Sequence, residues 1–256
     1  MRVTPAMLTE WLECPRRFQF RHVEGEVRPP LLRPVWENAV LRGLIACMKV
    51  KEEEDRLLSL DEMVRVVMEG YTSKLDLLEK PPRKGKMDSY FAHATTICQE
   101  FLHRDMAIIT PTQVSTLHIA QISTDKQGVS HELMAPVHVI DGNQIGMIAV
   151  NQYKMRKDIA LASPFLVCAV MATGIDHYWF LTVSVRKGAD FTKHHGYLPD
   201  GIKRWYEHII KEAAPMMENG PYPPCFPGVW YCCRAHCQYW GSCRGLYQLK
   251  ERVIRS

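Results

Sequence analysis

Residues 146–164 read GMIAVNQYKMRKDIALASP, and this stretch decides the fold class. Apolar residues at its two ends, in GMIAV and DIALA, predict two short strands separated by a polar connection. Pro164 then opens an apolar segment that stops at Gly174, which is typical of a buried helix. Another strand is expected in HYWFLTVSVRKG, so strands and helices are mixed along the chain.

The neighbouring segments extend this pattern. Residues 113–162 are rich in β-branched residues and turn signals, which predicts three or four strands in a meander. Apolar spacing predicts a short helix running into Cys14-Pro15, a second helix over 35–49, and a helical insertion over 51–110. The insertion contains an exposed basic loop, KPPRKGK.

The C-terminal part begins with an amphipathic helix expected over 198–218, and residues 220–256 form a tail rich in Cys, Pro and aromatic residues. His194-His195, just before that helix, is expected in a surface loop. We expect a single domain over residues 1–256, with the insertion and the tail attached to one α/β core.

The composition is that of a globular protein, because 46% of the 256 residues are hydrophobic and 23% are charged. No apolar run approaches the roughly 20 residues that cross a bilayer, and the N-terminus does not resemble a signal peptide. We therefore expect a cytoplasmic location and no membrane partner. The net charge of +4 permits a nucleic-acid partner without requiring one.

Nine cysteines are many for a cytoplasmic chain, where clustered thiols favour metal binding over disulfides. Cys47, Cys98 and Cys168 lie in apolar surroundings and are expected in the core.

In the tail sequence WYCCRAHCQYWGSC, four residues separate Cys232 from Cys237 and five separate Cys237 from Cys243, with Cys233 as an alternative to Cys232. Three thiolates this close can converge on one soft metal centre, and Cys14 is the candidate for the fourth ligand. An iron-sulfur cluster is favoured. A structural zinc ion stays open because thiolates bind both, and plain buried thiols are the third alternative.

CPRRFQF near the start, together with the C-x4-C-x5-C tail, resembles the iron-sulfur-containing RecB/AddB-like branch of the PD-(D/E)XK nucleases. That branch includes phage exonucleases and CRISPR-associated adaptation nucleases, and the resemblance spans almost the whole chain. It implies an α/β, restriction-endonuclease-like core, in which a mixed sheet is flanked by helices, and a 4Fe-4S cluster.

The resemblance also implies an activity: Mg²⁺- or Mn²⁺-dependent exonuclease cleavage of DNA, at single strands or duplex ends. Recombination or CRISPR adaptation proteins would be partners, in a bacterial, archaeal or phage-infected cell.

The family carries a Gly-x-Ile-Asp strand and then a strand with Glu-x-Lys. This sequence has Ala149 at the Asp position, and Ala160 and Ala162 at the Glu and Lys positions. The carboxylates would hold divalent ions and the Lys would orient the attacking water. Residues 160 and 162 are expected to share one face of a strand. Because a methyl group does none of this, we expect DNA binding without cleavage.

Glu132, on the strand before, is a weak additional site residue, and a surface Glu is the equal alternative. Two departures from the family pattern stand out. Leu41 replaces a His in AVLRGL, and PFLVCAVMATG lacks the usual Gln and Tyr.

Two explanations fit the alanines. Natural decay would leave assorted residues, whereas three alanines inside an intact GMI…SP context favour deliberate inactivation of a parent reading GMIDV and DIELKSP. A naturally inactive DNA-binding or scaffolding protein is the alternative, and a zinc-linked interaction protein is a further one.

The candidates for phosphate contacts are Arg16, Arg17, Arg42 and Lys84, although each alone is more compatible with a solvated surface position. The tail aromatics are expected to shield the metal site and not to stack on bases. They are Trp230, Tyr231, Tyr239 and Trp240.

Overall fold

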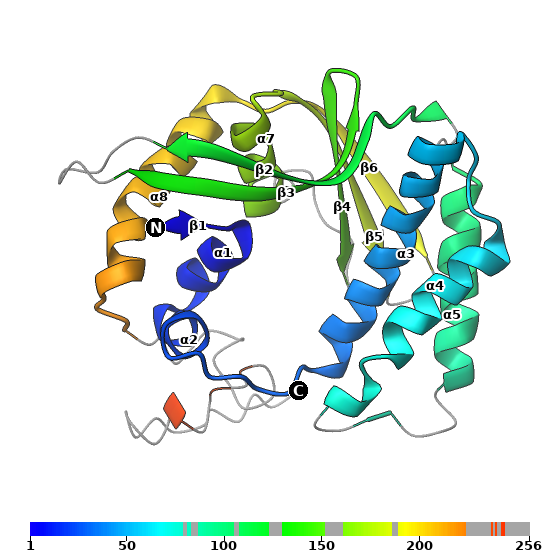
Figure 1. The fold of residues 1–256 in the computed structure, drawn as a ribbon, viewed down its shortest axis with the longest axis horizontal. Helices are drawn as coiled ribbons and strands as arrows, with labels where there is room; N and C mark the ends of the chain where they lie inside the picture. The colour runs from blue at the N-terminus through cyan, green and yellow to red at the C-terminus, as the bar shows by residue number, and fades with distance from the viewer. Residues whose placement is uncertain are drawn as a thin grey trace. The chain divides into compact units, whose positions relative to one another are not determined.

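The computed structural model describes residues 1–78, 81–82, 87–104, 108–122, 130–151, 161–185, 189–223, 237, 239 and 242–243. The elements of the described residues are shown in Figure 1. In chain order they are β1 (Arg2–Val3), α1 (Pro5–Glu13), α2 (Pro15–Phe18), the π-helix η1 (Gln19–Val23), α3 (Leu32–Glu54), α4 (Leu60–Thr72), the 3-10 helix η2 (Leu75–Leu77), α5 (Met87–Leu102), β2 (Gln113–Ile122), β3 (His131–Asp141), β4 (Gln144–Asn151), α7 (Pro164–Thr173), β5 (His177–Ser184), β6 (Asp190–Tyr197) and α8 (Asp200–Asn219).

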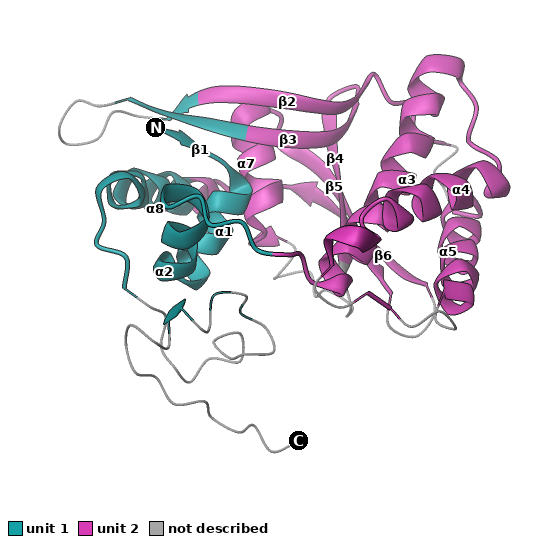
Figure 2. Cartoon of the chain, turned by 60° about the horizontal axis from the view of Figure 1, so that its bottom comes forward, with its two compact units in different colours: residues 1–28, 121–134, 204–256 teal, residues 29–120, 135–203 magenta. Residues whose placement is uncertain are grey.

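The chain divides into two compact units (Figure 2). Unit 1 comprises residues 1–28, 121–134 and 204–256, and unit 2 comprises residues 29–120 and 135–203. The strands β2 and β3 and the helix α8 each contribute residues to both units. The single domain over residues 1–256 stays a prediction from the sequence.

The sheet is mixed and has six strands in the order β1-β3-β4-β5-β6, with β2 also pairing with β3. The strands β3 and β4 are antiparallel, as are β5 and β6. The strands β4 and β5 are parallel, from Gln144 opposite His177 to Asn151 opposite Ser184. A parallel pair needs a crossover between its strands, and α7 lies in this connection.

The helices α3, α4 and α5 form the helical layer of unit 2 and share one hydrophobic core with the sheet. Ser59 begins α4 with a capping box, in which Ser59 and Glu62 bond each other's backbone N–H. Cys47 and Cys98 lie in this core and Cys168 is buried in α7, as predicted.

The parallel pair also requires a glycine. A Cβ added to Gly146 on β4 would lie 2.0 Å from Cζ2 of Trp179 on β5, because the indole ring packs directly on the glycine backbone. This approach permits the dense packing of the strand pair.

Two predictions about strands were wrong. Leu161 is helical and Ala162 lies in a turn, so neither belongs to a strand, and Pro164 starts α7 two residues later. His194 and His195 lie on β6 and not in a loop, since antiparallel pairing with β5 extends this polar segment. Non-local pairing of this kind overrides local composition.

Candidate functional site

Three side chains on neighbouring strands of unit 2 mark the predicted catalytic position. They are His138 on β3, Ala149 on β4 and Thr182 on β5, and Ala149 is the direct cross-strand partner of Thr182. The residues beside them on each strand belong to the core under the helical layer, namely Val139, Ile148, Val150, Leu181 and Val183. Since side chains alternate along a strand, the three face the opposite side of the sheet. The helix α7, which follows β4 in the chain, packs against β4 and β5.

His138 supplies the imidazole of this row. Its Nδ1 accepts a hydrogen bond from the backbone N–H of Ile148 at 2.9 Å, so the remaining ring proton belongs on Nε2. Burial lowers the pKa of His138 to about 4. The ring is therefore neutral at neutral pH and can donate one hydrogen bond but carries no charge. We did not single out this residue from the sequence, although a polar residue inside HELMAPVHVI was the available signal.

Thr182 supplies a hydroxyl on the other side of Ala149. Its side chain is only 2% exposed, and Oγ1 donates to the carbonyl oxygen of Thr192 at 3.3 Å. Ala149 thus lies on β4, between β3 and β5, which carry an imidazole and a hydroxyl group on the same face of the sheet as its methyl group. A carboxylate at position 149 would have polar neighbours, whereas alanine leaves the row without a carboxylate to bind a hard divalent ion.

The other two alanine positions are less well defined. Ala162 is exposed in the turn before α7, and Ser163 accepts the first helical hydrogen bond from the backbone N–H of Val167 at 3.0 Å. Ala160 lies outside the described residues. Because Ala162 is on no strand, the prediction that residues 160 and 162 share a strand face is not supported.

Glu132 is engaged elsewhere, in unit 1. Its Oε2 accepts from Nε of Arg2 at 2.7 Å, and the two residues are cross-strand partners in the β1–β3 pair. This arrangement matches the alternative of a surface glutamate at the start of a strand.

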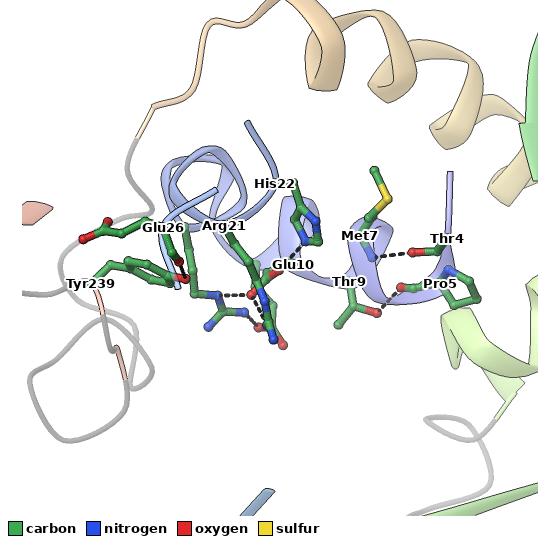
Figure 3. Close-up of polar contacts among 11 residues, drawn as sticks. Thr4, Pro5, Met7, Thr9, Glu10, Arg21, His22, Glu26 and Tyr239 are labelled. Carbon is green, nitrogen blue, oxygen red and sulfur yellow. Dashed lines mark hydrogen bonds and ion pairs between the residues drawn. The ribbon is translucent and has the colours of Figure 1, made fainter. Parts of the chain in front are cut away.

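The described tail residues pack on the N-terminal segment within unit 1. The ring of Tyr239 stacks on Phe20 with centroids 5.3 Å apart, and Cys237 and Cys243 contact the same cluster. The Tyr239 hydroxyl donates to the carbonyl oxygen of Glu26 at 2.9 Å (Figure 3). Tyr239 is 3% exposed, so it shields its neighbours and presents no ring face for a base.

The structure describes only part of the predicted cysteine ligand set. Cys14 is buried at the junction of α1 and α2, and Cys243 is buried beside Tyr239. Among the residues that the structure describes, no three His, Cys, Asp or Glu side chains lie close enough to hold a metal ion. Cys232 and Cys233 are outside those residues. The iron-sulfur cluster therefore remains a proposal that rests on the cysteine spacing.

A charged cluster joins α1 to η1 beside this region. Buried Glu10 accepts from Nη1 of Arg21 at 3.0 Å and pairs with Nε2 of His22 at 2.8 Å (Figure 3). Burial opposes ionisation of Glu10, but His22, Arg21 and Arg17 outweigh it and lower the pKa of the carboxyl group. Burial likewise opposes the charge of Arg17, while Glu13, Glu10 and Cys237 raise its pKa.

Some of the residues predicted to contact phosphate already interact with other side chains of the protein. Arg17 is paired with Glu13 and Glu10, and the guanidinium of Arg16 lies over the Phe20 ring at 4.6 Å. Arg42 is exposed on α3 and is the better placed candidate for a phosphate. Lys84 lies outside the described residues.

Comparison with solved structures gives a fold relationship. An inferred exonuclease from Eubacterium rectale matches with a TM-score of 0.54 at 10% identity, covering 98% of this chain and 90% of that one. The protein SSO0001 matches with a TM-score of 0.45 at 10% identity, covering 95% of this chain and 86% of that one. No family model matches the sequence, and no curated protein matches it. The chain shares its fold with the exonuclease, and the six-stranded mixed sheet flanked by helices is consistent with the PD-(D/E)XK-like core that the sequence predicts.

No helix of the described residues is long and apolar enough to cross a membrane.

Proposed function

We propose that this chain binds DNA on a nuclease-type fold and does not cleave it, because alanine occupies the positions of the catalytic Asp, Glu and Lys. The observation that carries the proposal is the row on β3, β4 and β5, where Ala149 lies opposite Thr182 with His138 on the strand before. The fold is shared with an inferred exonuclease, which makes DNA the substrate class to test first.

The parent activity would be hydrolysis of DNA phosphodiesters with Mg²⁺ or Mn²⁺, from an end or on single strands. Carboxylates at positions 149 and 160 would hold the ion, and a lysine at position 162 would orient the water. His138 and Thr182 would be uncharged neighbours of the first carboxylate. A 4Fe-4S cluster on Cys14, Cys237, Cys243 and a cysteine of the 232–233 pair would fasten the tail to the N-terminal helices. RecB/AddB-like recombination or CRISPR adaptation would be the setting.

The test restores the three side chains. The variant Ala149→Asp/Ala160→Glu/Ala162→Lys is incubated with Mn²⁺ and end-labelled single-stranded or blunt duplex DNA. The matched control carries Ala160→Glu/Ala162→Lys alone and lacks the first carboxylate. We expect degradation by the triple variant only. A folded triple variant that leaves every substrate intact contradicts the nuclease assignment and favours a naturally non-catalytic protein.

DNA binding is tested on the chain as it stands. Anisotropy of a labelled single strand should show binding that weakens steeply as salt rises from about 50 to 200 mM. Arg42→Ala should weaken binding and reduce the salt slope by about one. Arg33→Ala is the control, because Arg33 is paired with Glu37 on the same helix. Absence of binding at the lowest salt contradicts the proposal.

A further inference from the structure

The strand β2 is a sheet edge without the usual protection. Among the described residues it pairs with β3 alone, so the backbone groups of its outer side have no strand partner. Its sequence, QVSTLHIAQI, contains no Lys, Arg, Asp, Glu or Pro. Natural sheets protect long edges with such residues to prevent pairing between chains. At the other edge, β6 carries Asp190 and Lys193 and so conforms to that rule.

The centre of β2 also exposes large apolar side chains. Leu117 is 58% exposed and Ile119 is 51% exposed, and both point to the same side of the strand. On the opposite side, Oγ1 of Thr116 bonds to Nε2 of His118 at 3.0 Å. The chain bends at Ser115, which has a left-handed φ of 57°. The segment 116–120 is therefore a short, uncharged edge with one apolar and one polar face.

This segment is complementary to itself. In antiparallel pairing centred on His118, Leu117 of one copy lies opposite Ile119 of the other, and Thr116 lies opposite Ala120. Both apolar pairs then fall on the same face, and every contact occurs twice about a two-fold axis, as a closed dimer interface requires. No acidic or basic side chains of like charge meet across the pair, because the strand contains no Lys, Arg, Asp or Glu. A second copy of the chain thus matches the strand in hydrogen bonding, charge and side-chain type.

We propose that the chain forms a homodimer in which the β2 strands of two copies pair antiparallel about His118. The pairing continues the sheet of each copy into the other. It buries Leu117 and Ile119 against each other and satisfies the outer backbone groups of segment 116–120. This inference is independent of DNA binding and of the alanine positions.

The test is a charge exchange across the predicted pair. Light scattering after size exclusion should show a dimer for the unmodified chain over about a hundredfold range of concentration. Leu117→Glu and Ile119→Lys, made singly, should each weaken self-association by about tenfold or more. Each variant places an unpaired charge opposite an apolar side chain, and the two-fold symmetry repeats this contact in the dimer. The double variant should restore the dimer, because in this register the introduced acid and base face each other across the axis.

Leu77→Glu is the control, since Leu77 is 53% exposed on η2 and does not belong to the strand, and this change should leave the dimer intact. Circular dichroism of each variant shows that the fold is kept. A monomer at every concentration overturns the proposal, as does a folded single variant that dimerises like the unmodified chain. Monomeric singles whose double variant also stays monomeric overturn the register about His118.

Discussion

Acidification should destabilise the protein through His138, and a single substitution should remove that effect. The pKa of His138 is lowered from 6.5 to about 4 by burial. On acidification the unfolded chain therefore takes up this proton before the folded chain does. The contribution of His138 to stability is complete above pH 6.5 and is lost as the pH falls toward about 4.

The size of the loss follows from these two pKa values. Between about pH 7.5 and pH 4.5, linkage gives about 2.5 kcal/mol for a fully buried ring. We expect about 2 kcal/mol, because the ring is only partly buried in the sheet. Urea unfolding at both pH values measures the loss for the unmodified chain and for His138→Asn, whose Oδ1 can still accept from the Ile148 N–H.

The decisive quantity is the difference between the two losses, because buried carboxylates such as Glu10 also respond to acid. His138→Asn should lose about 2 kcal/mol less than the unmodified chain. His195→Asn, which removes an exposed ring on β6, is the control. Equal losses for the unmodified chain and His138→Asn would refute the inference that a neutral imidazole lies beside position 149.

Three further predictions concern single substitutions. Gly146→Ala should reduce the free energy of unfolding by about 2 kcal/mol or more, because its Cβ would overlap the indole on β5. Gly201→Ala, with open space at its Cβ, should change it by less than about 1 kcal/mol, and urea unfolding compares the two. Glu10→Gln should cost about 2 kcal/mol, because the largely buried Arg17 and the half-buried His22 lose a carboxylate partner, while Arg21 is exposed to solvent. The exposed Glu53→Gln should cost less than about 0.5 kcal/mol in the same assay. Cys237→Ala should abolish the iron content and visible absorbance of anaerobically purified protein and lower its melting temperature. If the unmodified chain is instead colourless and contains zinc, the metal centre is a zinc site and not an iron-sulfur cluster.

Much of the fold could be predicted because the local signals agree with the tertiary structure. The helix predicted from Pro164 to Gly174 is α7, and Gly174 ends it with a left-handed φ of 73°. The helix predicted over 35–49 is the central part of α3, and the strands of the meander before residue 151 are β2, β3 and β4.

The wrong predictions about strands have a common cause. Strands that pair with partners distant in the sequence need no distinctive local sequence pattern. The strand β6 is polar and contains a glycine, and only its register with β5 makes it a strand. The same holds for the site. Ala149 could be located because a sequence motif surrounds it, whereas His138 and Thr182 become its neighbours only through the order of strands in the sheet.

The two groups of candidate functional residues can be examined separately, because they belong to different compact units. Cys14, Cys237 and Cys243 lie in unit 1, while His138 and Ala149 lie in unit 2. The tail contacts that a metal centre would reinforce, those of Tyr239 with Phe20 and Glu26, are also confined to unit 1. Loss of the metal should therefore weaken the tail first and leave the pH response of His138 unchanged. Simultaneous loss of both on replacing Cys237 would show that the units unfold together, and would favour the single domain that the sequence predicts.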